Sequence, residues 1–229
     1  MHNLKLILLL GGLGALLASG CIFKPKPDPP EPPRNLYSES LIHPDSLITD
    51  LQVSYRRREI DPYANLLAPE FIFVFQEGDA TEIPEGFWNK DEDSTGTRSL
   101  FESIQVVDVR ISLNWFPGES AVTSNNEPAL RIAVITNLDV DVDGGATTLR
   151  VPGDQQHFYF RQGREENGED PTRWYISEWR DLGNAGGTGA PRGDLDPLSR
   201  DAGFENNDAG RRIEVVTMGE LRRRIGLGS

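Results

Sequence analysis

The sequence has a single cysteine, Cys21, and only three histidines among its 229 residues. One cysteine excludes an intrachain disulfide, although an exported protein is free to form one. The histidines, His2, His43 and His157, have no spacing typical of a metal site. The Gly-x-Ser-x-Gly motif of hydrolases, a phosphate-binding loop and a dinucleotide fingerprint are also missing. The sequence therefore predicts no metal and no cofactor.

Positive charge is scarce. The chain has 23 Lys and Arg residues against 36 Asp and Glu residues, a formal net charge of -13. Affinity for nucleic acid comes mainly from Lys and Arg on phosphates, and adhesion to anionic lipid has the same requirement. We therefore predict no nucleic-acid partner, and any membrane contact must have another origin.

Long apolar runs are missing too. The longest, Leu6 to Leu17, is shorter than the about 20 residues that span a bilayer. Lys5 precedes it and three small residues follow it, a pattern typical of a secretory signal peptide over residues 1–20. Cys21 comes next, and the junction resembles the lipobox of bacterial lipoproteins, with Ala18 at the position where leucine is usual. The alternative is an ordinary signal peptide followed by a chance cysteine.

The lipobox resemblance implies that Cys21 carries acyl chains that anchor the protein in the membrane. Ile22 stands where inner-membrane lipoproteins often have Asp, so the family's sorting rules imply the periplasmic face of an outer membrane. Residues 21–40 include the proline-rich run Lys24–Pro33, which predicts an extended tether. A docking site for a proline-binding partner is the alternative for this run.

The first part of the domain predicted at residues 41–183 is helical. Asp45 or Ser46 is suited to cap a helix whose apolar face repeats at helical spacing: Leu47, Ile48, Leu51 and Tyr55. Asp61 precedes Pro62 at the start of a second, short helix that has Tyr63 on its buried side and ends at Pro69. A third, weaker helix is expected between Asn89 and Ile104, with Leu100, Phe101 and Ile104 as apolar anchors.

The rest of the domain reads as strands. A short buried strand is predicted at Phe71–Phe75, followed by four longer ones: Gln105–Phe116, Leu130–Val142, Thr147–Arg161 and Arg173–Asp181. Clean apolar–polar alternation predicts antiparallel pairing with one face on a core. The fold class is therefore α+β, with N-terminal helices packed on a curved antiparallel sheet. Residues 184–212 are predicted to be a flexible Gly/Asp-rich tail, and residues 213–229 a short strand and a helix capped by Thr217.

Two segments, Tyr55–Phe75 and Trp174–Leu182, make the chain similar to the nuclear transport factor 2 superfamily of SnoaL-like, cystatin-like cones. The resemblance covers about Asp45 to Leu182 and is closest to uncharacterised bacterial lipoproteins of that fold. It implies a pocket inside the cone, and it implies possible homodimers, because relatives often dimerise. The candidate pocket residues are Tyr55, Tyr63, Trp88, Trp174 and Glu178.

In the ketosteroid-isomerase branch of this superfamily, an acid inside the cone takes a proton beside a carbonyl group. Glu178 is the candidate base, because it shares a side of its strand with Trp174, whereas His157 is expected to face outward. The alternative is that Glu178 pairs with an arginine such as Arg180 or Arg131.

We favour the non-enzymatic interpretation, in which the cone binds an apolar small molecule or a protein partner. An isomerase-like or hydrolytic enzyme with Glu178 as general base, and a dimeric assembly scaffold at the cell envelope, are the alternatives.

One further motif concerns calcium. Asp139 to Gly144 matches the first half of a calcium loop, but Arg150 stands at the twelfth position, where a bidentate Glu is needed. Alternating aspartates on the solvent face of a strand explain the partial match.

Overall fold

The computed structural model describes residues 36–38, 40–79, 83, 85–184, 205–206 and 212–226. They belong to one compact unit, Leu36–Ser229. The predicted signal peptide, Cys21 and the proline-rich run lie outside the described residues, as do residues 185–204 and 207–211 of the predicted tail. No helix within the described ranges has the length and apolar character needed to cross a membrane.

The helices follow the predicted order. α2 (Pro44–Arg57) and α3 (Ile60–Ala64) are followed by α4 (Lys90–Glu102), and α5 (Met218–Gly226) comes last. The predicted apolar face of α2 is confirmed as buried. The predicted caps Asp45 and Ser46 are wrong, because Pro44 occupies the first turn and the N-cap is His43.

α4 is better defined than its sequence suggested. Asn89 accepts hydrogen bonds from the backbone of Asp91 and Glu92, and the Glu92 side chain accepts one from Asn89 in return, which completes a capping box. Leu100 and Phe101 are buried as predicted, whereas Ile104 is 98% exposed, because α4 ends at Glu102 and Ile104 follows in the turn before the next strand.

One curved sheet carries the remaining elements. Its main path is β2 (Phe87–Asn89), β1 (Leu67–Val74), β7 (Trp174–Asn184), β6 (Thr147–Gln162), β5 (Pro128–Val142) and β3 (Val106–Trp115). β4 (Glu119–Val122) pairs with β5, and β9 (Arg212–Val215) pairs with β6 and with β8 (Glu205–Asn206). The predicted α+β fold is confirmed, with the refinement that β1–β7 and β6–β9 are parallel.

Two short turns of 3-10 helix link the strands, η3 (Asp143–Gly145) between β5 and β6 and η4 (Glu165–Asn167) between β6 and β7. The sequence predicts that Pro69 ends the second helix. Pro69 instead lies inside β1. The pairing of β1 with β7 is irregular between Leu67 and Ile72, and such an irregularity accommodates a proline that has no N–H to donate.

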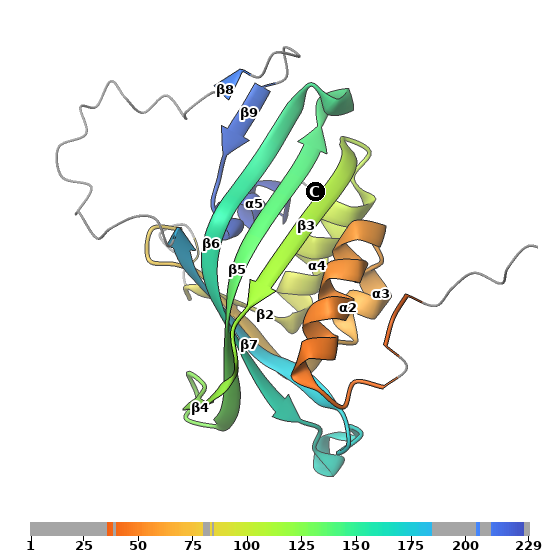
Figure 1. The fold of residues 1–229 in the computed structure, drawn as a ribbon, viewed down its shortest axis with the longest axis vertical. Helices are drawn as coiled ribbons and strands as arrows, with labels where there is room; N and C mark the ends of the chain where they lie inside the picture. The colour runs from red at the N-terminus through yellow and green to blue at the C-terminus, as the bar shows by residue number, and fades with distance from the viewer. Residues whose placement is uncertain are drawn as a thin grey trace, which may run out of the picture. The chain divides into compact units, whose positions relative to one another are not determined.

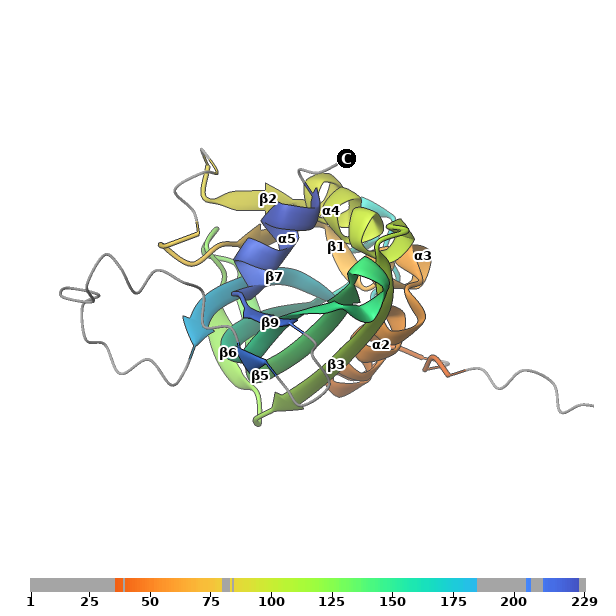
Figure 2. The same cartoon turned by 90° about the horizontal axis from the view of Figure 1, so that it is seen from above.

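The core lies inside the curve of the sheet. α2 packs on β3, and α4 packs on β1, so the helices cover the concave side (Figure 1). Viewed from above, the strands curl round this core and α5 lies across it, against α4 (Figure 2). The C-terminal helix is therefore an integral part of the cone.

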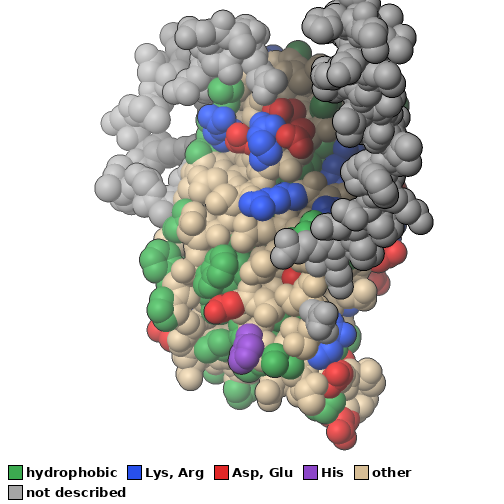
Figure 3. Space-filling view, turned by 45° about the vertical axis from the view of Figure 1, so that its right-hand side comes forward, with side chains coloured by type: hydrophobic (Ala, Val, Ile, Leu, Met, Phe, Trp, Pro, Cys, Tyr) green, Lys and Arg blue, Asp and Glu red, His purple; other side chains and the backbone are tan. Residues whose placement is uncertain are grey.

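Surface charges are mixed in sign. Figure 3 shows basic and acidic side chains side by side on one face, rather than a patch of a single sign. On the solvent face of the sheet, Arg110 pairs with Asp108 and Asp141, and Arg150 pairs with Asp139 at 2.8 and 3.0 Å. Two of the three aspartates of the partial calcium motif, Asp139 and Asp141, are thus paired with arginines.

Candidate functional site

Four polar side chains from four helices meet inside the cone. They are Tyr55 of α2, Tyr63 of α3, Asp93 of α4 and Arg222 of α5, and all four are buried. We call this group the inner polar cluster. It occupies the interior where the sequence resemblance implied a pocket.

The contacts of the inner polar cluster converge on a guanidinium. Arg222 Nη2 donates to the hydroxyl of Tyr55 at 3.0 Å and to that of Tyr63 at 3.3 Å, while Nη1 forms an ion pair with Asp93. The hydroxyl of Tyr63 in turn donates to Asp93 Oδ2 at 2.5 Å. The charge of Arg222 is therefore neutralised within the cone.

Aromatic rings form the wall beside this guanidinium. Arg222 Cζ lies 4.2 Å from the centre of the Phe73 ring and 4.4 Å from that of the Trp179 ring. Both distances are well within the range of cation–π attraction, which is strongest when the cation is desolvated. The cluster thus holds a cation by charge, by hydrogen bonds and by ring contact together.

The N-terminus of α5 is held by three carboxylates. Asp154 accepts a hydrogen bond from Met218 N at 2.8 Å, and Asp181 accepts one from Gly219 N at 3.0 Å. Asp79 accepts a hydrogen bond from the hydroxyl of Thr217. Negative charge at this position complements the helix dipole and satisfies N–H groups that have no partner within the helix. We call Asp79, Asp154 and Asp181 the carboxylate cradle.

Burial alters the acidity of these groups. It raises the pKa of Asp181 to about 7 and that of Asp154 to about 6, and the proximity of other carboxylates of the cradle adds to both shifts. Burial also raises the pKa of Tyr63 to about 12, despite the opposing charge of Arg222. A hydroxyl with this pKa keeps its proton at neutral pH and is a poor general acid.

Little space remains inside the cone. The void beside the inner polar cluster has a volume of about 10 Å³, room for no more than one water molecule. It is lined from α2, α4, β5 and α5 by the following residues: Tyr55, Gly96, Thr97, Leu100, Leu138, Met218, Leu221 and Arg222. With α5 in place, a substrate has no access to the buried tyrosines.

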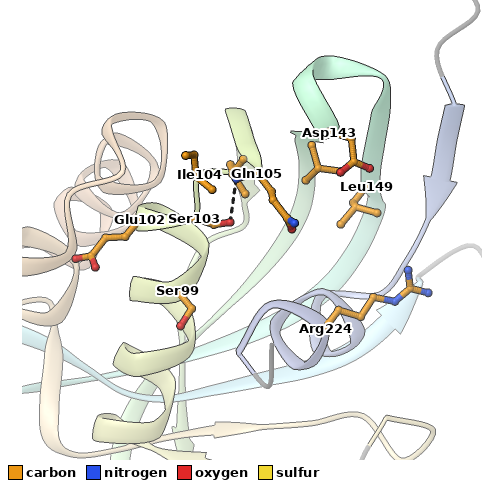
Figure 4. Close-up of a pocket in the computed structure, with 10 residues that line it drawn as sticks. Ser99, Glu102, Ser103, Ile104, Gln105, Asp143, Leu149 and Arg224 are labelled. Atoms are coloured by element: carbon orange, nitrogen blue, oxygen red, sulfur yellow. Dashed lines mark hydrogen bonds between the residues drawn. The ribbon is translucent and has the colours of Figure 1, made fainter. Parts of the chain in front are cut away.

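A larger opening lies at the rim. A groove of about 620 Å³ runs between the C-terminal end of α4 and the turn that joins β5 to β6, with α5 beside it (Figure 4). Glu102 and Asp143 stand on its two sides, and Arg224 is engaged by Glu214 and Glu220. These charged groups do not converge on one point of the groove.

The structure brings together two of the predicted pocket residues, Tyr55 and Tyr63, whose rings pack edge to face at 5.8 Å. Trp88 lies on β2 and packs on Phe75 at 5.0 Å. Trp174 starts β7, where its backbone N–H donates to Leu41 O at 2.8 Å. Both tryptophans are half-buried at the margin of the core rather than part of the inner polar cluster.

Glu178 does not point into the cone. The pairing of β6 with β7 shifts register between Tyr159 and Phe160, which inserts an extra residue in β7 and reverses its alternation. As a result Ile176 and Trp179 both lie in the core.

Glu178 instead accepts hydrogen bonds from the backbone and hydroxyl of Ser124, at 2.7 and 3.1 Å, and pairs with Arg180. The predicted arginine pairing is confirmed, and the inward orientation that a general base requires is wrong. His157 follows the expected pattern, since it lies half-buried while its neighbours Phe158 and Phe160 are in the core.

Sequence reasoning missed Asp93, Arg222 and the carboxylate cradle. A signal for Arg222 was present, because Met218, Leu221 and Arg222 stand at the spacing of the buried face of a helix. A charged residue at such a position predicts a buried partner, and Asp93 stands similarly four residues before Thr97 and seven before Leu100 in α4. No group of three or more His, Asp or Glu side chains in the described part of the chain is placed to hold a metal ion.

Comparison with known proteins gives a likeness in fold. No protein-family model matches the sequence, and no curated protein matches it. Among solved structures, one match is a nuclear transport factor 2-like superfamily protein from Salmonella enterica, at 14% identity and a TM-score of 0.45, covering 65% of this chain and 92% of the other.

Two further matches are of the same kind. One is a nuclear transport factor 2-like protein of unknown function in nutrient uptake from Rhodospirillum rubrum, at 15% identity and a TM-score of 0.39, covering 60% and 94% of the two chains. The other is a domain of unknown function with a cystatin-like fold from Nostoc punctiforme, at 13% identity and a TM-score of 0.40, covering 61% and 74%. Each of the three matches covers most of its own chain and about three fifths of this one.

Proposed function

We propose that the chain is a bacterial lipoprotein anchored by acyl chains on Cys21 at the periplasmic face of an outer membrane, and that its cone is a non-enzymatic domain that binds a protein partner. The anchor is supported by the sequence of residues 1–21, with its apolar run, small residues and single cysteine. The acidic balance of the chain supports attachment through acyl chains rather than through basic residues.

The interior of the cone is filled by side chains, and this supports the proposal that the cone binds a protein partner. Small-molecule sites are usually cavities of about 300–1,000 Å³ that bury most of the ligand. The void inside this cone is about 10 Å³, because Met218, Leu221 and Arg222 of α5 fill the space. A protein partner does not need an internal cavity, so it suits this cone better than an apolar small molecule does.

The chemistry of the interior also argues against catalysis. Tyr63 has a pKa raised to about 12, and the carboxylate of Asp93 is committed to Arg222 and Tyr63. Glu178, the predicted base, is tied to Ser124 and Arg180. A general base has to reach the substrate proton, and the carboxylates of Asp93 and Glu178 are both buried and paired with an arginine.

Native mass spectrometry of residues 35–229, purified from a periplasm, tests the binding proposal. We expect the mass of the bare polypeptide, because α5 leaves no room for a retained ligand inside the cone. A discrete extra mass that disappears on denaturation would favour a small-molecule function instead. The same spectrum distinguishes a monomer from the dimer that the scaffold alternative requires.

The anchor has its own test. The full-length chain, expressed in a bacterium fed with labelled palmitate, should incorporate the label and sediment with membranes, whereas Cys21→Ala should do neither. Label on the Cys21→Ala variant would contradict lipidation at this residue.

A further inference from the structure

We propose that the inner polar cluster and the rings beside it form a guanidinium-binding site, which in the free chain holds Arg222 and which accepts an arginine from a helix of a protein partner in its place. This inference rests on the proposed function, since it names the chemistry by which a partner is recognised. Because Arg222 belongs to the same chain as the site, we call it the cis ligand.

The site fits the shape of a guanidinium. Phe73 and Trp179 present rings about 4 Å from the planar group, and Asp93 meets its Nη1. Tyr55 and Tyr63 accept from its Nη2. A planar cation with several donors satisfies all of these contacts at once, and a lysine ammonium does not.

Charge also selects the occupant. Around α5, the buried charged side chains of the rest of the cone are carboxylates: Asp93, Asp154 and Asp181. The other arginine buried in the described part of the chain, Arg161, is committed to Glu70 and Glu169. Without α5, the carboxylate of Asp93 loses the cation with which it pairs, so the occupant has to supply one.

The carboxylate cradle sets the second requirement. It binds the backbone N–H groups of Met218 and Gly219 and the hydroxyl of Thr217, which any helix with a Thr or Ser N-cap can provide. Arg222 follows this cap by five positions. The expected ligand is thus the first two turns of a helix with an arginine at the fifth position after its cap.

The cis ligand leaves its contacts incomplete. Nε of Arg222 has no hydrogen-bond partner within the described structure although the residue is buried, and the same holds for Nε1 of Trp179. A buried donor without an acceptor carries a substantial penalty. A partner segment that brings acceptors for Nε1 of Trp179 and for the Nε of its own arginine would bind more favourably than α5 does, which allows exchange.

Chemical rescue of the full-length chain in detergent tests the site. Arg222→Ala removes the cis ligand and opens a cavity beside Asp93. We expect N-ethylguanidinium chloride at millimolar concentration to raise the Tm of this variant saturably, by about 3 °C, because a ligand that binds only the folded state stabilises it. N-ethylurea, a neutral mimic of the same shape, and an equal concentration of NaCl should not, and Asp93→Asn in the same chain should abolish the response.

A labelled peptide tests recognition in trans. The peptide spanning residues 217–229 should bind the Arg222→Ala chain at least about tenfold more tightly than the same peptide with alanine at the position of Arg222. Wild-type protein should bind the arginine peptide more weakly than the variant does, because α5 competes. Equal affinity of the two peptides for the variant would overturn the proposal, as would equal responses to N-ethylguanidinium and N-ethylurea.

Three outcomes distinguish failure of the site from failure of the proposed function. If circular dichroism shows that Arg222→Ala is unfolded, the titration becomes a refolding assay, and failure of N-ethylguanidinium to restore the folded spectrum overturns the site. A small-molecule mass in the native spectrum would refute the proposed function and leave the guanidinium site standing. A bare mass together with failed rescue would refute the site alone.

Discussion

Two sets of arginine–aspartate pairs lie in this molecule, one inside the cone and one on the outer face of the sheet. The side chains of Arg222 and Asp93 are 3% and 0% exposed, whereas those of Arg150 and Asp139 are 38% and 24% exposed. The residue types are the same, and the surroundings differ. The comparison separates what an ion pair does in water from what it does in a core.

Burial changes the consequence of losing a partner. An exposed charge that loses its partner is solvated by water, so exposed pairs contribute about 0.2–1 kcal/mol. A buried charge that loses its partner is not solvated by water, and breaking the pair costs about 3–5 kcal/mol. The inner pair therefore fixes where α5 docks, while the outer pairs contribute little to stability.

The largest expected effect is that of Asp93→Asn. This change keeps the shape of the side chain and removes its charge, so Arg222 is left uncompensated in the core. We expect the free energy of unfolding to fall by about 3–5 kcal/mol, measured by urea denaturation. Asp139→Asn on the outer face is the matched control, with an expected loss of less than about 1 kcal/mol. Equal losses in the two variants would contradict the expected difference between the buried pair and the exposed pair.

The next effect is pH dependence from the carboxylate cradle. The pKa of Asp181 is raised to about 7 and that of Asp154 to about 6, so the folded protein retains protons that the unfolded chain releases near pH 4. The free energy of unfolding contributed by these groups is therefore highest below about pH 4 and falls as pH rises to about 7. Each unit of pKa displacement corresponds to roughly 1.4 kcal/mol.

Asp181→Asn isolates this contribution. The variant should lose less stability than the wild type between pH 5 and pH 8, followed by Tm in buffers of matched ionic strength. Asp139→Asn is the control and should keep the wild-type slope, because it leaves the carboxylate cradle unchanged. A slope in Asp181→Asn as steep as that of the wild type would show that the cradle does not titrate in this range.

A smaller effect is expected when both members of the buried pair are replaced together. Arg222→Met with Asp93→Leu removes the two charges and keeps much of the volume, and such replacements are often neutral or stabilising. We expect the double variant to lose less stability than Asp93→Asn alone, with a remaining cost of about 1–3 kcal/mol because the buried Tyr63 hydroxyl loses its acceptor. A double variant as unstable as Asp93→Asn would mean that packing, rather than charge, accounts for the loss.

The smallest effect is that of Arg150→Gln on the outer face. This loss should be less than about 1 kcal/mol and should shrink further in 0.5 M NaCl, because salt screens exposed charges. Urea denaturation at two salt concentrations measures it. A loss that is larger and insensitive to salt would indicate that Arg150 is part of a structural network like that of Arg222.

The elements with regular apolar spacing could be predicted from the sequence. The buried face of α2 and the four long strands follow directly from periods of 3.6 and 2. Tyr55 and Tyr63 were predicted as pocket residues and do lie in the inner polar cluster.

Features that depend on tertiary contacts could not be predicted in this way. The pairing of Asp93 with Arg222 requires α5 to fold back across the cone, which local spacing does not specify. The orientation of Glu178 depends on a register shift between β6 and β7, and one extra residue in a strand reverses every side chain that follows it. Strict alternation therefore predicted the wrong side for Glu178.

Hydrogen exchange of the wild-type domain tests the central claim, that α5 is docked in the cone through Arg222. Amides of Gly219 to Arg222 should exchange slowly, comparably to those of β5 in the core, and Asp93→Asn should accelerate them while β5 stays protected. Exchange of these α5 amides at the rate of an unstructured peptide in the wild type would contradict the account.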